Sequence, residues 1–335
     1  MALTINTNIS SLIAQRNFDS ATAALNLSIE RMTTGYTINH AADNAAGYSI
    51  SDMWVTQLGS LDVAADNAAT GADLLTTAEE TYSLLTSHLQ RVRDLTEQAA
   101  NGTYGSQSLR AIQSEIYARL QEVDRIAANA EFNGIKLMSF STSGDNSDVG
   151  ITSDGLNLQV GLYADEYSRI KLDVSLFEDA SISGLFKSLT QQGAVTLDTI
   201  LTKAGGDTTN FASEKNLMAF AAACSGLRYD STEDALYLRA TDGYGATDML
   251  AYVDAAINEI AGRVTNIGAA QNRVNSAISA LDVQSQNLTS SLSTLRDTDI
   301  AEESSKFIQA QILQQASATL LSTANQLPSV ALNLI

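Results

Sequence analysis

Residues 253–295, VDAAINEIAGRVTNIGAAQNRVNSAISALDVQSQNLTSSLSTL, decide the fold of this chain. Along this stretch one row of side chains recurs at alternating steps of three and four residues, and only Gln271 and Ser285 in it are polar. The row consists of Val253, Ile257, Ile260, Val264, Ile267, Gln271, Val274, Ile278, Leu281, Ser285, Leu288, Leu292 and Leu295. This spacing predicts a very long helix with a single apolar seam, which needs partner helices to cover it.

Two stretches in the first half of the chain supply those partners. Residues 61–92 repeat the same spacing with one slip in phase after Leu75. Residues 109–130 repeat it again, after a helix-breaking turn at 101–105 with the sequence NGTYG. Three long amphipathic helices, two before the middle of the chain and one after it, predict an elongated bundle of near-antiparallel helices.

The middle of the chain, residues 140–246, is rich in Gly, Ser, Thr and Asp and contains short alternating apolar runs. The alternation at 156–162 and at 170–176 predicts two half-buried strands joined by a polar turn. A second strand pair and an alanine-rich helix are predicted at 227–229, 235–239 and 214–224. The predicted fold class is therefore mainly α with an α+β insert, in which the middle of the chain forms a small outer domain.

The two ends of the chain carry large apolar residues on a helical repeat, but few charges lie between them. Because a solvated helix normally has a charged outer face, we expect these end helices to be surrounded by protein, including copies of the same chain. The repeating positions are Ile5, Ile9, Leu12, Phe18, Ala21, Leu25, Ile29 and Met32, and then Ile308, Ile312, Ala316, Leu320, Ala324 and Leu327.

These patterns divide the chain into three parts. We expect a terminal paired-helix layer at 1–45 and 300–335, a helical bundle layer at 46–139 and 247–299, and a strand-containing surface insert at 140–246. The side chains expected to form the assembly seam are Ile9, Leu12, Phe18, Leu25, Met32, Val264, Ile267, Val274, Ile278, Leu281, Leu288, Ile312 and Leu320.

Composition excludes several classes of partner. The 335 residues carry a formal net charge of −19, and an acidic surface repels nucleic acids and anionic membranes. No apolar stretch approaches the roughly 20 residues of a membrane span. The first residues lack the basic and apolar regions of a cleavable signal peptide, so an extracellular location implies export without one. The single proline, Pro328, fits both rapid folding after export and long helices that exclude proline.

Residues suited to catalysis or to metal binding are scarce. His40 and His88 are the only histidines, and both are predicted to lie on helix surfaces or between subunits. Cys224 follows three alanines and has no charged neighbour, which predicts a small buried side chain rather than a nucleophile. The acidic residues at 230–234 fit weak calcium binding or a solvated turn, and the turn is the stronger interpretation. We expect no enzyme activity, no cofactor and no metal site.

Several short sequence blocks occur in a fixed order near both ends of the chain. They are INTN (5–8), IERMTTGYTIN (29–39), DNAAG (43–47), LQRVRDL (89–95), NGT (101–103), FNG (132–134), AQNRVNSAI (270–278) and AQILQQA (310–316). The set resembles bacterial flagellin, the subunit of the flagellar filament. The resemblance covers residues 1–139 and 248–335 and does not extend to the middle of the chain.

This resemblance implies a structural subunit that self-assembles into an extracellular filament for swimming motility. The two ends would line the filament core and fold on polymerisation, the bundle would surround them, and the insert would face the medium. The resemblance also implies export through the flagellar secretion apparatus, a chaperone that holds the C-terminal segment, a cap at the growing tip, and contact with hook-junction proteins.

Two surface roles remain as further expectations. By resemblance, Arg91, Leu95 and Glu115 would contact Toll-like receptor 5 of animal hosts, although the same patch can pack against the next subunit. The linker residues Ser141, Thr142 and Ser143 are candidates for O-glycosylation, and ordinary loop composition explains them equally well.

Some residues depart from the family pattern, and two alternative functions stay open. Asp94 replaces the usual glutamate, Thr37 and Ala42 stand where basic residues are common, and Ile335 replaces a frequent arginine. These departures affect receptor potency and the details of subunit contacts. A hook–filament junction protein would share the paired end helices, and a surface adhesin would use the insert to bind glycans.

The uncharged end helices generate a first prediction. A protease should trim both termini of soluble subunits and spare them in filaments, because the ends are expected to order only against neighbouring copies. Mass spectrometry of the digested material in both states measures this difference. Equal resistance of soluble and assembled protein would contradict folding on assembly.

Overall fold

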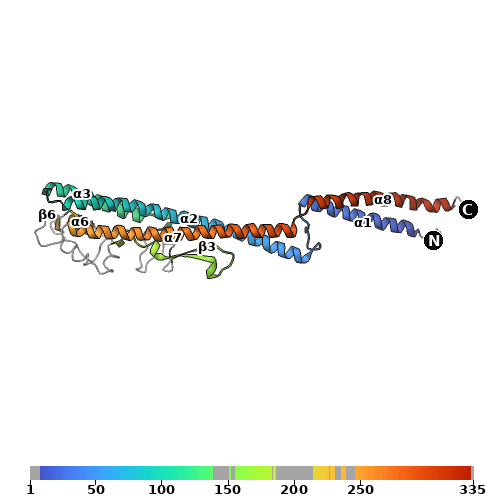
Figure 1. Cartoon of the computed structure of the whole chain (residues 1–335), viewed down its shortest axis with the longest axis horizontal. Coiled ribbons are helices and arrows are strands. Elements are labelled where there is room, and N and C mark those ends of the chain that lie inside the picture. Colours follow the sequence, from blue (N-terminus) through green and yellow to red (C-terminus); the bar gives the residue numbers. More distant parts are fainter. Residues whose placement is uncertain are drawn as a thin grey trace. The chain divides into compact units, whose positions relative to one another are not determined.

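The computed structural model describes residues 8–138, 151, 155–182, 184–185, 214–225, 227–230, 235–238 and 246–332. The chain is mainly helical, as predicted (Figure 1). Its long helices are α1 (Ile9–Thr34), α2 (Ala45–Ala100), α3 (Ser106–Asn129), α7 (Ala246–Arg296) and α8 (Ile300–Leu332). A shorter helix, α6 (Glu214–Cys224), lies in the middle of the sequence.

The chain forms two compact units. One contains Met1–Asp62 with Val283–Ile335, and the other, which we call the bundle unit, contains Val63–Asp282. Both boundaries fall inside the continuous helices α2 and α7, whereas the sequence analysis placed its layer boundaries near helix ends, at 45/46 and 299/300.

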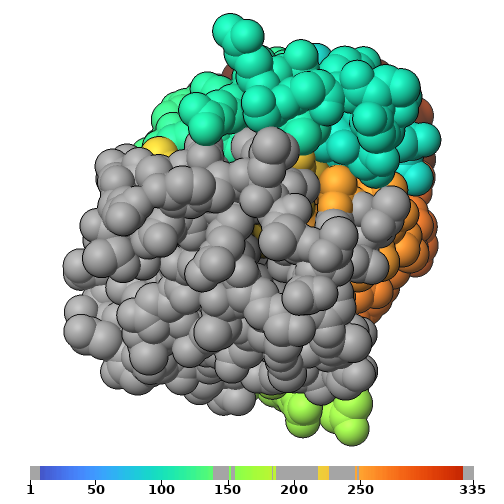
Figure 2. Space-filling model, turned by 90° about the vertical axis from the view of Figure 1, so that its left-hand side faces the viewer, coloured from blue at the N-terminus to red at the C-terminus, as the bar shows by residue number. Residues whose placement is uncertain are grey.

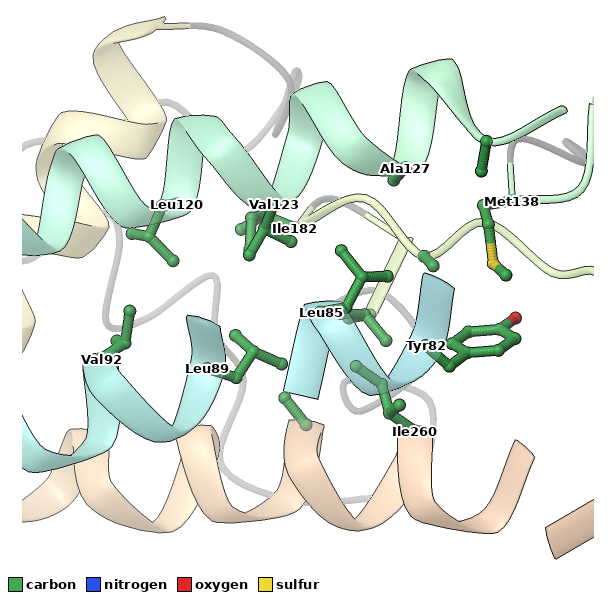
Figure 3. Packing of buried hydrophobic residues seen from close by; sticks show 14 of the residues in the cluster. Tyr82, Leu85, Leu89, Val92, Leu120, Val123, Ala127, Met138, Ile182 and Ile260 are labelled. Carbon is green, nitrogen blue, oxygen red and sulfur yellow. The ribbon is translucent and has the colours of Figure 1, made fainter. Parts of the chain in front are cut away.

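The core of the bundle unit consists of apolar side chains from α2, α3 and α7 (Figure 3). The largest contributions from α2 and α3 are Tyr82, Leu85, Leu89, Val92, Ile116, Leu120 and Val123. From α7 the predicted row supplies Val253, Ile260, Ile267 and Val274, all fully buried. The slip in the apolar repeat of α2 does not interrupt the helix. Leu74 and Leu75 are both buried, so the row of buried side chains continues on the neighbouring face of the helix after this point.

Polar bridges fix the antiparallel order of these helices. Near one end of the pair the Gln271 amide donates to Glu79 at 2.8 Å, and further along Arg93 donates to Asp254 at 2.6 Å. Seen from the end of the bundle where α2 passes into α3, the surface of these helices lies beside that of α7 (Figure 2).

The strands form three separate antiparallel hairpins. They are β1 (Glu131–Phe132) with β2 (Ile135–Lys136), β3 (Leu156–Gln159) with β4 (Arg169–Leu172), and β5 (Leu227–Asp230) with β6 (Ala235–Leu238). The last two hairpins and α6 confirm the predicted elements of the middle. The first hairpin was missed, although its turn Asn133-Gly134, with φ of 49° and 81°, is a strong hairpin signal.

Both predicted strands of the second hairpin are shorter than expected, and the run predicted at 156–162 ends at Gln159. The run predicted at 170–176 ends at Leu172, and Val174–Leu176 form a 3-10 turn instead. The reason is local, because the side chain of Asp173 accepts a hydrogen bond from the backbone N–H of Ser175 at 2.9 Å and turns the chain. That bond to the ionised carboxylate also lowers the pKa of Asp173.

The β3–β4 hairpin packs directly on α2. A Cβ atom at Gly71 would meet the Leu158 side chain at 2.4 Å, so the absence of a side chain there lets the hairpin approach the helix. Asn67 of α2 also donates to the main-chain oxygen of Gln159 at 3.3 Å. Residues 141–154 and 241–246, near the two edges of the insert, lie outside the described residues, apart from Ile151 and Ala246. Within the described part of the chain, no helix has the length and apolarity required to cross a membrane.

The packing of α2 generates a second prediction. Replacing the fully buried Leu89 with alanine should lower the free energy of unfolding of the bundle unit by about 2–5 kcal/mol, because a cavity forms. The matched control on the same helix is Leu84→Ala, which removes a side chain that is 48% exposed and should cost less than about 1 kcal/mol. Urea unfolding followed by circular dichroism measures both. Equal losses for the two variants would contradict this core.

Candidate assembly surfaces

The helices α1 and α8 lie side by side and run antiparallel (Figure 1). Three side-chain bonds set their register. Asn8 donates to the main-chain oxygen of Ala324 at 2.7 Å, Ser11 donates to Asn325 at 2.7 Å, and Gln314 donates to Thr22 at 3.0 Å. Buried or half-buried polar pairs of this kind specify register because any shift leaves their groups unpaired.

The seam between α1 and α8 is built around small side chains spaced seven residues apart. The buried members on α1 are Ala14, Ala21 and Ser28, and those on α8 are Glu303, Ala310, Ser317 and Ala324. Half-buried residues alternate with them, also seven apart: Ser11, Phe18, Leu25 and Met32 on α1, and Phe307, Gln314 and Leu321 on α8. A heptad with one small position lets two helices approach closely, but it buries little apolar surface.

Eight large aliphatic side chains of this pair face outward. They are between 50% and 61% exposed and comprise Ile9, Leu12, Ile13, Ile300, Ile308, Ile312, Leu313 and Leu320. Scattered exposed apolar residues are ordinary, but a concentration of eight on two paired helices indicates an interaction surface. We call these eight side chains the outward apolar set.

The seam therefore differs from the repeat read from the sequence. Phe18, Leu25 and Met32 do lie in the seam, whereas Ile9, Leu12, Ile312 and Leu320 lie outside it. The repeat expected on α8 advances by steps of four, which rotate around the helix by about 40° each, so a straight partner cannot follow it. Of that repeat only Ala324 reaches the seam among the residues with described side chains.

Five of the six expected seam positions of α7 belong to the bundle unit. Ile267, Val274 and Leu281 are buried, and Val264 and Ile278 pack half-buried against the bundle core. Leu288 is half-buried and belongs to the other unit, beyond Asp282.

A clasp joins the ends of α1 and α7 to the segments that follow them. Gly35 caps α1 with φ of 77°, and its main-chain oxygen accepts from Thr298 at 2.9 Å. The N–H of Thr37 donates to the main-chain oxygen of Arg296 at 2.7 Å. The Arg296 guanidinium lies 4.1 Å from the centre of the Tyr36 ring. The two connections are thus held as one antiparallel ribbon.

The residues predicted to contact a receptor occupy α2 and α3 of the bundle unit. Arg91 and Glu115 form an exposed ion pair at 2.9 Å, and Arg119 lies 3.9 Å from the same carboxylate. Leu95 is only 1% exposed and packs in the core. A partner approaching the folded bundle therefore reaches Arg91 and Glu115, but it does not reach the side chain of Leu95. Ser141, Thr142 and Ser143 lie outside the described residues.

Comparison with known families agrees with this arrangement. The family model described as bacterial flagellin N-terminal helical region matches residues 5–143, and that of the bacterial flagellin C-terminal helical region matches residues 250–335. This chain belongs to the bacterial flagellin family. The two matches include all of α1, α2, α3 and α8 and most of α7.

Several flagellins of the genus Vibrio are similar to the chain along its whole length. Polar flagellin F of Vibrio parahaemolyticus is 32% identical over 379 aligned positions, flagellin B of Vibrio cholerae 32% over 375, and flagellin A of Vibrio anguillarum 33% over 383. Each alignment covers 100% of both chains. Flagellins are structural proteins of the bacterial flagellar filament, and the chain is classed with them rather than with enzymes.

The chemistry of the described residues is consistent with a structural role. Burial raises the pKa of the Cys224 thiol to about 12, which confirms the predicted buried cysteine and keeps it protonated. His40 lies on the surface with its Nδ1 atom 3.1 Å from Glu30, and His88 is half-buried. In the ranges that the structure describes, no three acidic, histidine or cysteine residues are grouped to hold a metal ion. Glu233 and Asp234, part of the weak calcium candidate, lie outside these ranges.

The exposed ion pair of this flagellin generates a third prediction. Replacing Arg91 or Glu115 with alanine should change the free energy of unfolding of the bundle unit by less than about 1 kcal/mol, because solvent screens the pair. Urea unfolding measures the change, and Glu80→Ala on the exposed face of α2 is the control. A loss above about 2 kcal/mol would show that the pair is structural, and these variants could then not report on binding.

Proposed function

We propose that this flagellin self-assembles into the flagellar filament for swimming motility, and that neighbouring copies cover the outward apolar set. The observation that carries the proposal is that eight large aliphatic side chains of α1 and α8 are at least half exposed, while the buried positions of their seam are mostly alanine and serine. Each large aliphatic side chain gains about 1.5–3 kcal/mol when it is fully buried. The surface outside the pair therefore offers more burial energy than the seam itself.

The same arrangement supports folding on polymerisation. The seam contains Glu303, Gln314 and Ser317, so the isolated pair buries little apolar surface against the conformational entropy of 59 helical residues, 26 in α1 and 33 in α8. Neighbouring copies supply the remaining burial. A contact that joins different surfaces of identical chains without closing a ring generates a helical polymer.

The layers expected from the sequence fit this proposal. Residues 1–45 and 300–335 would form the inner paired-helix layer, and 46–139 with 247–299 would form the bundle layer around it. Residues 140–246 would face the medium. The charge of −19 would keep unassembled subunits apart in solution.

Export and capping follow from the same exposed side chains. Before assembly, Ile308, Ile312 and Leu320 on α8 would need cover, and a flagellar export chaperone on the C-terminal segment would provide it. We propose export without a cleaved signal peptide, followed by addition of subunits beneath the filament cap and contact with hook-junction proteins at the base.

A second role as a ligand of Toll-like receptor 5 involves the α2–α3 surface. Arg91 and Glu115 would make the contacts, because both are exposed and held together. The buried Leu95 would act indirectly, by fixing the helix that carries Arg91. We propose O-glycosylation at Ser141, Thr142 and Ser143 on the basis of the sequence alone.

Substitution of the outward apolar set tests the proposed assembly, and this is the fourth prediction. Ile312→Ser and Leu320→Ser should each raise the critical concentration for seeded polymerisation by about tenfold or more, because burial energy between copies is lost. The control Ala318→Ser changes an exposed small residue of the same helix and should leave it nearly unchanged. Sedimentation of polymer from soluble subunits measures the critical concentration.

Unchanged assembly of the double variant Ile312→Ser/Leu320→Ser would contradict the proposal. Circular dichroism of the soluble variants confirms that the bundle unit is intact, so that a loss of polymer is not a loss of fold.

A further inference from the structure

The segment that follows the β3–β4 hairpin enters the bundle core. We call residues 176–182 the neck segment. Its side chains Leu176, Phe177, Ala180 and Ile182 are all at most 5% exposed, and the N–H of Ala180 donates to the main-chain oxygen of Met138 at 3.1 Å. Met138, two residues after the end of β2, is itself fully buried. The hydrogen bond between Ala180 and Met138 therefore joins the residues that precede and follow the β3–β4 hairpin.

Three helices each supply one polar side chain to the main chain of the neck segment. From α2, the Tyr82 hydroxyl donates to the oxygen of Leu176 at 3.1 Å. From α3, a carboxylate oxygen of Asp124 accepts from the N–H of Ile182 at 2.7 Å. From α7, Arg263 donates to the main-chain oxygens of Glu178 at 3.0 Å and Asp179 at 3.3 Å.

Tyr82 and Arg263 are buried and Asp124 is half-buried, at a cost that their partners must offset. The Arg263 side chain is 4% exposed, and it also pairs with the carboxylates of Glu178 at 3.3 Å and Glu259 at 3.4 Å. Burial raises the pKa of both Tyr82 and Asp124. Apolar residues at these positions would stabilise a well-packed bundle equally well, so we interpret the polar residues as serving a specific structural role.

We propose that Tyr82, Asp124 and Arg263 are positioning residues that lock the neck segment onto the bundle and thereby hold the β3–β4 hairpin against α2. Because these four hydrogen bonds end on main-chain atoms, the lock depends mainly on the path of the backbone, and Arg263 adds one ion pair with the Glu178 side chain. Further contacts that hold the hairpin are the Leu158 contact at Gly71 of α2, one 3.3 Å bond from Asn67, and the burial of Ile170 and Leu172 in the core. Release of the neck should therefore loosen the hairpin without opening the bundle.

Hydrogen exchange resolved to single amides, measured on the full soluble chain, tests this fifth prediction. In Arg263→Met, the amides of Ala180 and Ile182 and those of β4 should exchange roughly 10- to 100-fold faster, because buried main-chain oxygens lose their donor. The amides of Val92 and Val274 in the bundle core should keep their rates. The control Arg273→Met lies on the exposed face of α7 and should change none of them.

A conservative pair at Asp124 separates positioning from general packing. Asp124→Asn keeps an oxygen acceptor, so exchange at Ile182 should stay within about threefold of the wild type, whereas Asp124→Ala should raise it roughly tenfold or more. Wild-type rates at the neck in both Arg263→Met and Asp124→Ala would overturn the proposal. So would an equal rise at every amide of the bundle, since that would indicate global destabilisation. If Arg263→Met does not fold, the Asp124 pair decides the question by itself.

Discussion

The bundle unit depends on one interaction, the burial of the apolar row of α7 by α2 and α3. Val253, Ile260, Ile267 and Val274 are fully removed from solvent, and the largest side chains of α2 and α3 pack against the same core. At roughly 1.5–3 kcal/mol for each such side chain, this burial exceeds the contribution of the polar bridges along the same helices. The hairpin and the neck segment use the surface that this packing creates.

The pair of α1 and α8 uses the opposite distribution of size. In the bundle many large side chains are fully buried. In the terminal pair the buried residues are mainly alanine and serine, five larger apolar side chains of the seam are only half-buried, and eight large aliphatic side chains lie outside. The physical consequence is a close helix pair that buries little apolar surface between its two helices and exposes large apolar side chains on its outside. In the proposed filament, this arrangement would separate a part that folds alone from a part whose stability depends on other copies.

Polar side chains serve register and attachment rather than stability. Thr22 and Gln314 align the terminal pair, and Gln271 aligns α7 with Glu79 of α2. Arg263 and Asp124 form hydrogen bonds with the main chain of the neck segment. Each of these groups is costly when it is unpaired, so each one disfavours alternative packings that the apolar rows alone would allow.

The sequence by itself determined the long helices, the hairpins at β3–β4 and β5–β6, and the family, because heptad spacing, alternation and short ordered blocks are local signals. It did not show that Leu95 is buried, that the seam of α8 passes through Phe307, Gln314 and Leu321, or that residues 176–182 enter the core. Only the tertiary structure decided these points. The face of a helix that meets its partner, and the polar side chain that meets a distant backbone, depend on contacts between residues far apart in the chain, which no local spacing encodes.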